Sequence, residues 1–299
     1  MRKIFIDELI LAAKKNKKII LIVNDLGYNV VEKFAKLFPS QFFNAGVAEQ
    51  NMMGIAAGMA LDGYHVFVYS IGNFPTFRCS EQIRNDVDYH NLPVTIVNVG
   101  AGLSYGNLGY SHHSLQDYGL MRLFPNMLIA SPGDEMETKA CMKYILKKPQ
   151  PSYLRLSKSN TKLLHNKIPN VKPGKWLTLF KSKRSSKKIF LTTGNVSNIA
   201  KKFLTEKNFY NYSIYSLPLW GMKYKKEQLN QIRKWDKIVV LEDHLEDGGF
   251  GSWIKESTNN NIIKTHIISK SLSKKVIGKV GSEKYLLENN YLKFINKYN

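Results

Sequence analysis

Short apolar runs rich in β-branched residues alternate with segments of helical periodicity through the first half of the chain. The runs have the length of buried strands, and they lie at 17–25, 64–70, 92–100, 127–131 and 151–157. Between them, apolar residues recur at helical spacing near residues 29–38, 49–62, 80–90, 115–123 and 134–147. Asp134 is placed to cap the last of these helices, with Glu137 at its third position. Strands that alternate with helices predict a parallel sheet covered on both faces.

The alternation stops at residues 161–186, where Pro, Gly and Lys residues interrupt it, and then resumes. Further apolar runs follow at 187–195, 210–219, 236–244 and 262–268. We therefore expect two α/β domains with mainly parallel sheets, at 1–160 and 187–299, joined by a linker at 161–186. A chain of 299 residues is long enough to bury two cores.

Composition narrows the class of protein. Hydrophobic residues make up 43% and aromatic residues 12%, which is typical of a folded globular protein. No apolar run reaches the roughly 18 residues that cross a membrane, and the lysine-rich N-terminal segment predicts an amphipathic helix rather than a signal peptide. Only Cys79 and Cys141 occur, which predicts neither a disulfide framework nor a metal site. We expect a cytoplasmic protein that makes no membrane contact.

The formal net charge of +21 raises the question of nucleic-acid binding. The lysines are scattered in pairs along the chain, and no motif interleaves them with aromatic residues. We interpret them as a solvated surface rather than a nucleic-acid interface. Such a surface favours phosphorylated substrates or an acidic partner subunit.

One acidic residue ends a predicted strand and another opens a predicted helix, in the loop region where ligands of α/β sheets collect. Asp25 ends the first strand, a position that Asp often occupies as a turn former. Glu49 opens a helix built from Met, Gly, Ile and Ala. Its interaction with the helix dipole, about 0.3–1 kcal/mol, explains the sign of the charge but not its apolar neighbours. Apolar surroundings favour the protonated carboxyl, which suits a group that shares a proton with a ligand nitrogen.

Two further segments carry candidate chemistry. Phe74 and Phe77 follow a strand end three residues apart and could form a stacking wall for a flat heterocycle, although core packing is the commoner reason for such spacing. The segment "GAGLSYGNLGYSHHSLQD" at 100–117 predicts a long irregular loop of the functional kind, with His112 and His113 adjacent. No third ligand stands at metal-like spacing, so we expect no metal site there.

These segments together resemble the pyrimidine-binding domain of transketolases and of the related deoxyxylulose-phosphate synthases. The resemblance rests on "NAGVAEQNMMGIAAGMALDG" (44–63), the aromatic strand end at 69–77, "SHHSLQD" (111–117) and "FPNMLIASPGDEMET" (124–138), in the family's order. The stretch "VVLEDHLEDGGFGSWI" (239–254) is similar to the family's C-terminal domain. The resemblance covers essentially the whole chain. It implies a thiamine-diphosphate-binding pyrimidine domain followed by a transketolase C-terminal-type domain.

The resemblance also implies roles for single residues. Glu49 falls on the family glutamate that hydrogen-bonds N1′ of the cofactor's aminopyrimidine and so activates it. Phe74 and Phe77 match positions that pack on the pyrimidine ring, and Asp25 matches a strand-end position near the cofactor.

Three residues match the substrate side of the family's site. His112 matches the histidine that faces the reacting carbonyl and hydroxyl groups, as a catalytic and substrate-binding residue, and His113 is expected beside it. Lys158 falls near a basic position that helps to hold a sugar phosphate.

Departures from the family pattern imply a partner and a changed substrate. The Gly-Asp-Gly…Asn motif that binds the diphosphate through Mg²⁺ (or Ca²⁺) does not occur in these 299 residues. We therefore expect a separate diphosphate-binding subunit, in a heterotetramer that contains this chain as a homodimer. Ser80 stands at a family aromatic position, Leu108 replaces an acidic residue, and a phosphate-contacting histidine is replaced near Gly100.

Three functions stay open at this point. The first is transfer of a two-carbon ketol unit between phosphorylated or nucleotide-activated sugars by a split transketolase-like enzyme. The second is decarboxylating condensation, as in deoxyxylulose-phosphate synthases or 2-oxoacid dehydrogenase β subunits, which would release carbon dioxide. The third is a non-catalytic partner subunit that has retained the fold.

Overall fold

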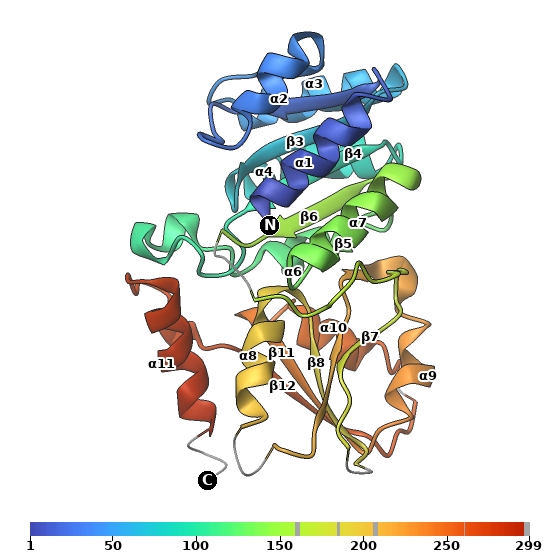
Figure 1. Ribbon diagram of the computed structural model, residues 1–299, viewed down its shortest axis with the longest axis vertical. Helices are drawn as coiled ribbons and strands as arrows, with labels where there is room; N and C mark the ends of the chain where they lie inside the picture. The colour runs from blue at the N-terminus through green and yellow to red at the C-terminus, as the bar shows by residue number, and fades with distance from the viewer. Residues whose placement is uncertain (159–161, 184–185, 206–208, 260, 296–299) are drawn as a thin grey trace.

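The computed structural model describes residues 1–299 other than 159–161, 184–185, 206–208, 260 and 296–299, and it contains two sheets that lie one above the other in Figure 1. All strand pairs within each sheet are parallel except one at an edge. The predicted α/β class with mainly parallel sheets is confirmed.

The first sheet has seven strands in the order β10-β5-β6-β4-β3-β1-β2. Their bounds are β1 (Ile19–Val23), β2 (Phe42–Asn44), β3 (His65–Ile71), β4 (Val94–Val99), β5 (Leu128–Ala130), β6 (Ser152–Leu156) and β10 (Leu219–Trp220). The edge strand β10 comes from the second half of the chain and pairs antiparallel with β5. The first sheet therefore includes backbone from beyond the predicted first domain.

The second sheet has five strands in the order β12-β11-β8-β9-β7. Their bounds are β7 (Leu177–Phe180), β8 (Lys188–Thr192), β9 (Ser213–Ser216), β11 (Lys237–Leu245) and β12 (His266–Leu272). Strand β7 lies inside the predicted linker, where its residues alternate between partly buried and exposed. It pairs antiparallel with β9, so part of this segment belongs to the second sheet.

Helices cover both faces of the first sheet because successive side chains of its strands point to opposite sides. Ile20 and Ile22 pack in one core cluster with Met52 of α3, and Leu21 packs in another with Phe5 of α1. The helices are α1 (Arg2–Ala13), α2 (Glu32–Leu37), α3 (Glu49–Leu61), α4 (Phe74–Phe77), α5 (Ser80–Gln82), α6 (Asp117–Met121), α7 (Glu135–Lys147), α8 (Ser197–Phe203), α9 (Gln228–Ile232), α10 (Phe250–Glu256) and α11 (Glu283–Ile295).

The predicted helix boundaries are right at α7 and only partly right at 80–90. Asp134 caps α7, because its Oδ1 accepts a hydrogen bond of 2.7 Å from the backbone N–H of Glu137. At 80–90 the chain forms the short α5 followed by a π-helix, Ile83–Asp88. Such wide turns are rare and often occur near functional sites.

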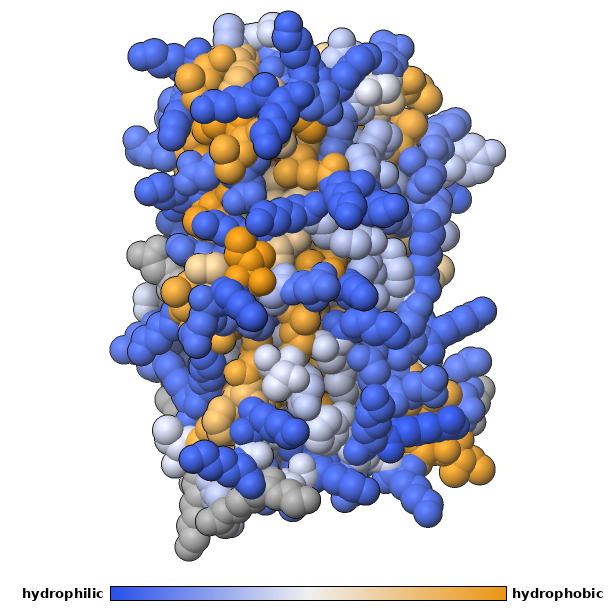
Figure 2. All heavy atoms as spheres, turned by 45° about the vertical axis from the view of Figure 1, so that its right-hand side comes forward, coloured by the Kyte–Doolittle hydropathy of each residue, from blue (hydrophilic) through white to orange (hydrophobic). Residues whose placement is uncertain are grey.

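Hydrophilic side chains dominate the face of the molecule in Figure 2, and the apolar side chains there form separate patches. Among the residues that the structure describes, no helix has both the length and the apolar character needed to cross a membrane.

A buried guanidinium joins the two sheets. Arg155 of β6 donates from Nε to Asp117 Oδ2 at 2.6 Å and from Nη1 to Asp243 Oδ1 at 2.6 Å. Its Nη2 donates to the backbone oxygen of Ser114 at 2.9 Å. Burial opposes the charged guanidinium, but the two carboxylates more than offset this, and the pKa of Arg155 lies above its ordinary value.

We expect Arg155→Met to lower the free energy of unfolding by about 3–5 kcal/mol, because it leaves two carboxylates buried without their counter-charge. Urea unfolding followed by circular dichroism measures this. The matched control is Lys255→Met, which removes an exposed pair with Glu246 at 3.9 Å and should cost less than about 1 kcal/mol. Equal effects of the two variants would contradict a structural role for the buried pair.

We also expect the free energy of unfolding to depend on pH through His65. Burial lowers the pKa of His65 to about 4, from 6.5 in the unfolded chain. Between these values the unfolded chain binds a proton that the folded chain does not, so stability falls as pH falls through this window. We expect His65→Gln to reduce the acid-induced loss of unfolding free energy by up to about 3 kcal/mol. Urea unfolding at pH 7, 5.5 and 4.5 tests this; parallel curves for variant and wild type would refute it.

Candidate functional site

The candidate site lies at the carboxyl edge of the first sheet, where segments that follow four neighbouring strands meet. Asn24 follows β1, Phe74 follows β3, the loop at 100–116 follows β4, and Lys158 follows β6. These four strands are adjacent and parallel. Their ends therefore bring together residues that are far apart in the sequence. We call residues 100–116 the histidine loop.

Glu49 is buried at the start of α3, and its carboxylate has two polar partners. Its Oε1 accepts hydrogen bonds from Asn24 Nδ2 at 2.9 Å and from Arg78 Nη1 at 2.7 Å. Among the described residues, Oε2 accepts none. The prediction of apolar surroundings is therefore wrong for the carboxylate itself. After β3 the chain turns so that the half-exposed Arg78 lies against the Glu49 carboxylate.

Arg78 and Phe74 connect Glu49 with the histidine loop. The Arg78 guanidinium lies 4.3 Å from the ring centroid of Phe74, and the Phe74 ring meets His112 edge-on at 5.2 Å between centroids. Phe77 stands at the other end of α4 and is 45% exposed. No ring contact in the described part of the chain joins Phe77 to Phe74. The structure thus brings Phe74 into the site and leaves Phe77 at the surface beside it.

The adjacent histidines have different environments. The half-buried His112 has its Nδ1 3.0 Å from Ser111 Oγ, and burial together with the positive charge of Arg78 lowers its pKa. It is therefore neutral near pH 7 and able to exchange a proton. His113 is fully buried, with its Nε2 3.3 Å from the carbonyl oxygen of Gly106. Its ring faces the inside of the loop, and this position does not support the expected substrate contact.

Tyr105 links His112 to Lys158. The Lys158 ammonium lies 4.6 Å from the ring centroid of Tyr105, and the Tyr105 ring lies 6.2 Å from that of His112. The Tyr105 ring also lies over Gly100, where a Cβ would overlap it. Gly100 has φ +101°, which favours glycine. The Tyr105 ring therefore occupies the space that a side chain at position 100 would fill.

Asp25 lies next to this set of contacts but takes no direct part in them. It is exposed in the left-handed region at φ 58°, and its backbone N–H donates to Asn44 Oδ1 at 2.9 Å. Asn44 in turn donates to Asp25 Oδ1 at 3.2 Å. The contact with Glu49 comes from the preceding residue, Asn24.

The thiol beside Glu49 is not a nucleophile. Cys79 is buried, donates to the backbone oxygen of Glu49 at 3.4 Å, and has its pKa raised to about 12 by burial. In the described part of the chain, no group of three His, Cys, Asp or Glu side chains is arranged to hold a metal ion.

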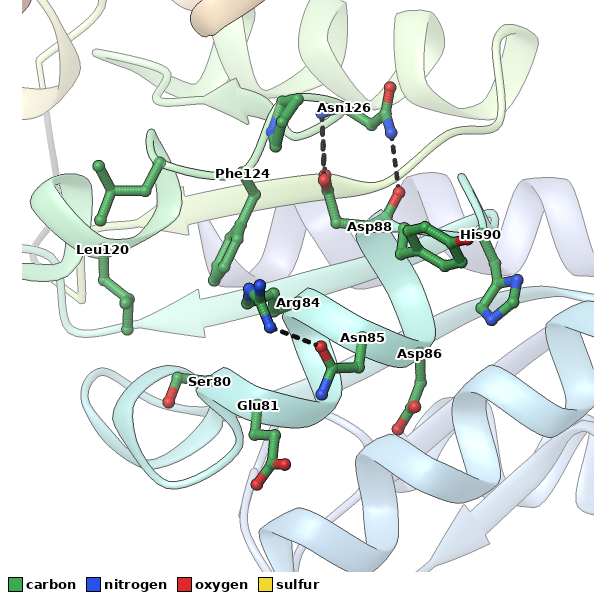
Figure 3. Close-up of a pocket in the computed structure, with 13 residues that line it drawn as sticks. Ser80, Glu81, Arg84, Asn85, Asp86, Asp88, His90, Leu120, Phe124 and Asn126 are labelled. Atoms are coloured by element: carbon green, nitrogen blue, oxygen red, sulfur yellow. Dashed lines mark hydrogen bonds between the residues drawn. The ribbon is translucent and has the colours of Figure 1, made fainter.

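An open groove of about 1200 Å³ lies apart from these residues, between the π-helix and the segment 120–126. Figure 3 shows Arg84, Asp88 and Phe124 on its walls, with Asp88 receiving the backbone N–H of Asn126 at 3.0 Å. Glu49, Phe74, His112 and Lys158 do not line it. The Asp88 carboxylate holds the backbone of Asn126. We therefore interpret the groove as a packing feature and not as a reactive site.

Sequence analysis missed three residues of the site. Asn24 has a local signal, since it is a buried amide directly after a run of apolar strand residues. Arg78 and Tyr105 have none, because each reaches its partner across the sheet edge. A cation four residues after Phe74 is compatible with many helix surfaces.

Comparison with known proteins identifies the family. Residues 1–162 match the family model "Transketolase, pyrimidine binding domain". The "Putative transketolase C-terminal section" of Methanocaldococcus jannaschii is 33% identical over 293 residues, 96% of this chain and 90% of the relative. One of the subunits of an apulose-4-phosphate transketolase from Phocaeicola vulgatus is 30% identical over 280 residues, 89% of this chain and 86% of the relative.

A solved structure extends the likeness to both sheets. It is described as "Split gene transketolase, inactive beta4 tetramer", with a TM-score of 0.82 and 25% identity over 99% of this chain and 96% of the other. The family match, the relatives and the shared fold agree with the resemblance seen in the sequence. The chain belongs to the transketolase family, in which it corresponds to the C-terminal subunit of a split transketolase.

Proposed function

We propose that this chain is the pyrimidine-binding subunit of a thiamine-diphosphate-dependent transketolase that transfers a two-carbon ketol unit between sugars. The observation that carries the proposal is the buried Glu49, whose Oε2 has no partner among the described residues and which contacts through Arg78 and Phe74 connect to His112. A carboxylate next to a ring and a neutral histidine at a sheet edge is suited to hold a nitrogen heterocycle beside a reacting oxygen.

The polar atoms around Glu49 fit an aminopyrimidine. Such a ring offers an amino group and ring nitrogens, so it needs acceptors as well as a proton partner. Glu49 Oε2 can take part in that exchange, and Asn24 Oδ1 is buried with no hydrogen bond from the described residues. Phe74 supplies an apolar face. When bound, the cofactor would supply the carbon atom that accepts and donates the ketol unit.

The remaining residues act on the substrate in this proposal. His112 is neutral near pH 7, so it can take a proton from a sugar hydroxyl and return it to the carbonyl oxygen. Lys158 projects a positive charge from the end of β6 at the far side of Tyr105. It would attract the phosphate of a phosphorylated sugar, and the Phocaeicola vulgatus relative is named for such a substrate.

A second subunit completes the site in this proposal. The diphosphate motif and its Mg²⁺ (or Ca²⁺) would come from a separate transketolase N-terminal subunit, with two copies of each chain in a heterotetramer. Both relatives are named as parts of a transketolase, one as a C-terminal section and the other as a subunit, which supports a divided enzyme. Phe77, exposed beside Phe74, is free of ring contacts in the described residues and would meet cofactor or partner there.

We expect Glu49→Gln to lower turnover of the two-subunit enzyme by at least about 100-fold, because the amide cannot exchange a proton with a ring nitrogen. The assay is ketose consumption by the reconstituted pair. Carbon dioxide release in the same assay, with a 2-oxoacid as donor, would identify decarboxylating condensation instead.

The matched control is Glu8→Gln on α1, which packs in the core cluster on the opposite face of the sheet. It should leave turnover unchanged. Circular dichroism and size-exclusion chromatography should show the wild-type fold and assembly for both variants. Wild-type turnover in Glu49→Gln would refute the assigned role.

We also expect cofactor binding to need both subunits. A tagged form of this chain, purified from its own cells, should bring down a stoichiometric protein that carries a Gly-Asp-Gly…Asn motif. Calorimetry with Mg²⁺ should then detect tight thiamine-diphosphate binding by the pair and not by this chain alone. Tight binding by the isolated chain would contradict the divided site, and no binding by the pair would favour a non-catalytic role.

A further inference from the structure

The C-terminal part of the chain packs directly on the loop that carries His112. Residues 276–288 are here called the C-terminal segment. They comprise the end of the connection between β12 and α11 and the first turns of α11. In Figure 1 the upper end of α11 lies beside the short helical turns of the histidine loop, Gly106–Leu108 and Tyr110–His112. The two regions are more than 160 residues apart in the sequence, so their contact needs an explanation.

Gly106 is the centre of this contact. Its carbonyl oxygen accepts the backbone N–H of Gly281 at 3.1 Å, and the same oxygen lies 3.3 Å from Nε2 of His113. A Cβ on Gly106 would overlap the carbonyl oxygen of Gly281 and lie 2.8 Å from Leu286 Cδ1. Glycine is thus needed for the close approach of the two backbones. The shared oxygen ties the C-terminal segment to the residue next to His112.

Side chains reinforce the backbone contact on both sides. Glu283 Oε1 accepts from Ser104 Oγ of the histidine loop at 3.3 Å and from Asn195 Nδ2 after β8 at 3.0 Å. Leu286 is 2% exposed and belongs to the same core cluster as Leu103 of the loop. The loop is therefore held by a carboxylate at Ser104 and an apolar contact at Leu103, just before Tyr105, and by the backbone contact of Gly106 just after it.

We propose that the C-terminal segment is a positioning element that holds Tyr105 and His112 in their catalytic arrangement. The inference rests on the proposed function, because it assigns the segment a purpose in substrate binding at that site. Glu49, Phe74 and Arg78 stand on or beside α3 and α4, and the contacts that join them to one another do not involve the segment. Loosening it should therefore affect the substrate side of the site and spare the cofactor side.

The test uses Gly106→Ala in the full chain, assembled with its diphosphate-binding partner. We expect KM for the acceptor sugar phosphate to rise by about tenfold to 100-fold, since displacement of site groups by about 1 Å has effects of this size. The dissociation constant for thiamine diphosphate should stay at the wild-type value. A merely structural defect would instead lower the active fraction and leave KM unchanged.

A second readout needs no activity. Leu108 and Tyr110 are exposed in the histidine loop, and chymotrypsin cleaves after such residues. Cleavage between 105 and 112 in this chain alone should become faster in Gly106→Ala. The matched control is Gly119→Ala on α6, where a Cβ would lie 3.7 Å from the backbone of Gly248, an ordinary contact. That variant should match wild type in KM and in cleavage.

Glu283→Ala provides an independent variant that creates no overlap, and it decides the question if Gly106→Ala does not fold. It should raise KM and speed cleavage as Gly106→Ala does, because it removes the carboxylate that joins Ser104 of the loop to Asn195. Wild-type KM and wild-type cleavage in a folded Gly106→Ala or Glu283→Ala protein would overturn the proposal. If the wild-type pair bound no thiamine diphosphate, the proposed function would fail, and faster loop cleavage in the variants would still show that the segment holds the loop.

Discussion

The buried Arg155 fixes the arrangement on which the rest of the structure depends. Its guanidinium contacts Asp117 after the histidine loop, Ser114 within that loop, and Asp243 of the second sheet. Removing three charges from water is costly, and only the close pairing of all three offsets that cost. The pairing therefore admits one relative placement of the two sheets. Because Arg155 lies three residues before Lys158, it also fixes the end of β6 from which Lys158 extends.

Residues from both halves of the chain shape the histidine loop. At one end Gly102 lies so close to the Asp243 carboxylate that a Cβ would overlap it. Further along, Gly106 lies against Gly281. Asp243 thus serves two purposes, as the counter-charge of Arg155 and as a wall for the loop. This gives the second sheet a role at the candidate site, while the neighbouring buried acid, Glu242, accepts the backbone N–H groups of Phe250 and Gly251 at the start of α10.

The sequence allowed prediction of the parts of the site that depend on local pattern. Strand ends locate Glu49, Phe74, His112 and Lys158 at one sheet edge, and the structure joins these four through Arg78 and Tyr105. The linking residues depend on contacts across the edge, which no periodicity records. The same limit explains β10, whose two residues pair with β5 from a distant part of the sequence. His113 and His112 have identical local contexts, so only the loop geometry distinguishes the buried ring from the one at the site.

The distribution of charge follows from how the fold uses its acids. Seven acidic side chains are buried in the described residues, against one Lys or Arg side chain, Arg155; the acids are Glu49, Asp88, Asp117, Asp134, Glu137, Glu242 and Asp243. Several of them accept backbone N–H groups at helix starts or turns, as Asp134, Glu137 and Glu242 do. Carboxylates are thus buried while the lysines lie at the surface. The net charge of the solvent-facing side chains is therefore more positive than the formal +21 of the whole chain. A field of this sign raises the local concentration of anions at an open sheet edge. It therefore acts in the same direction as the positive charges of Lys158 and Arg78 at this edge.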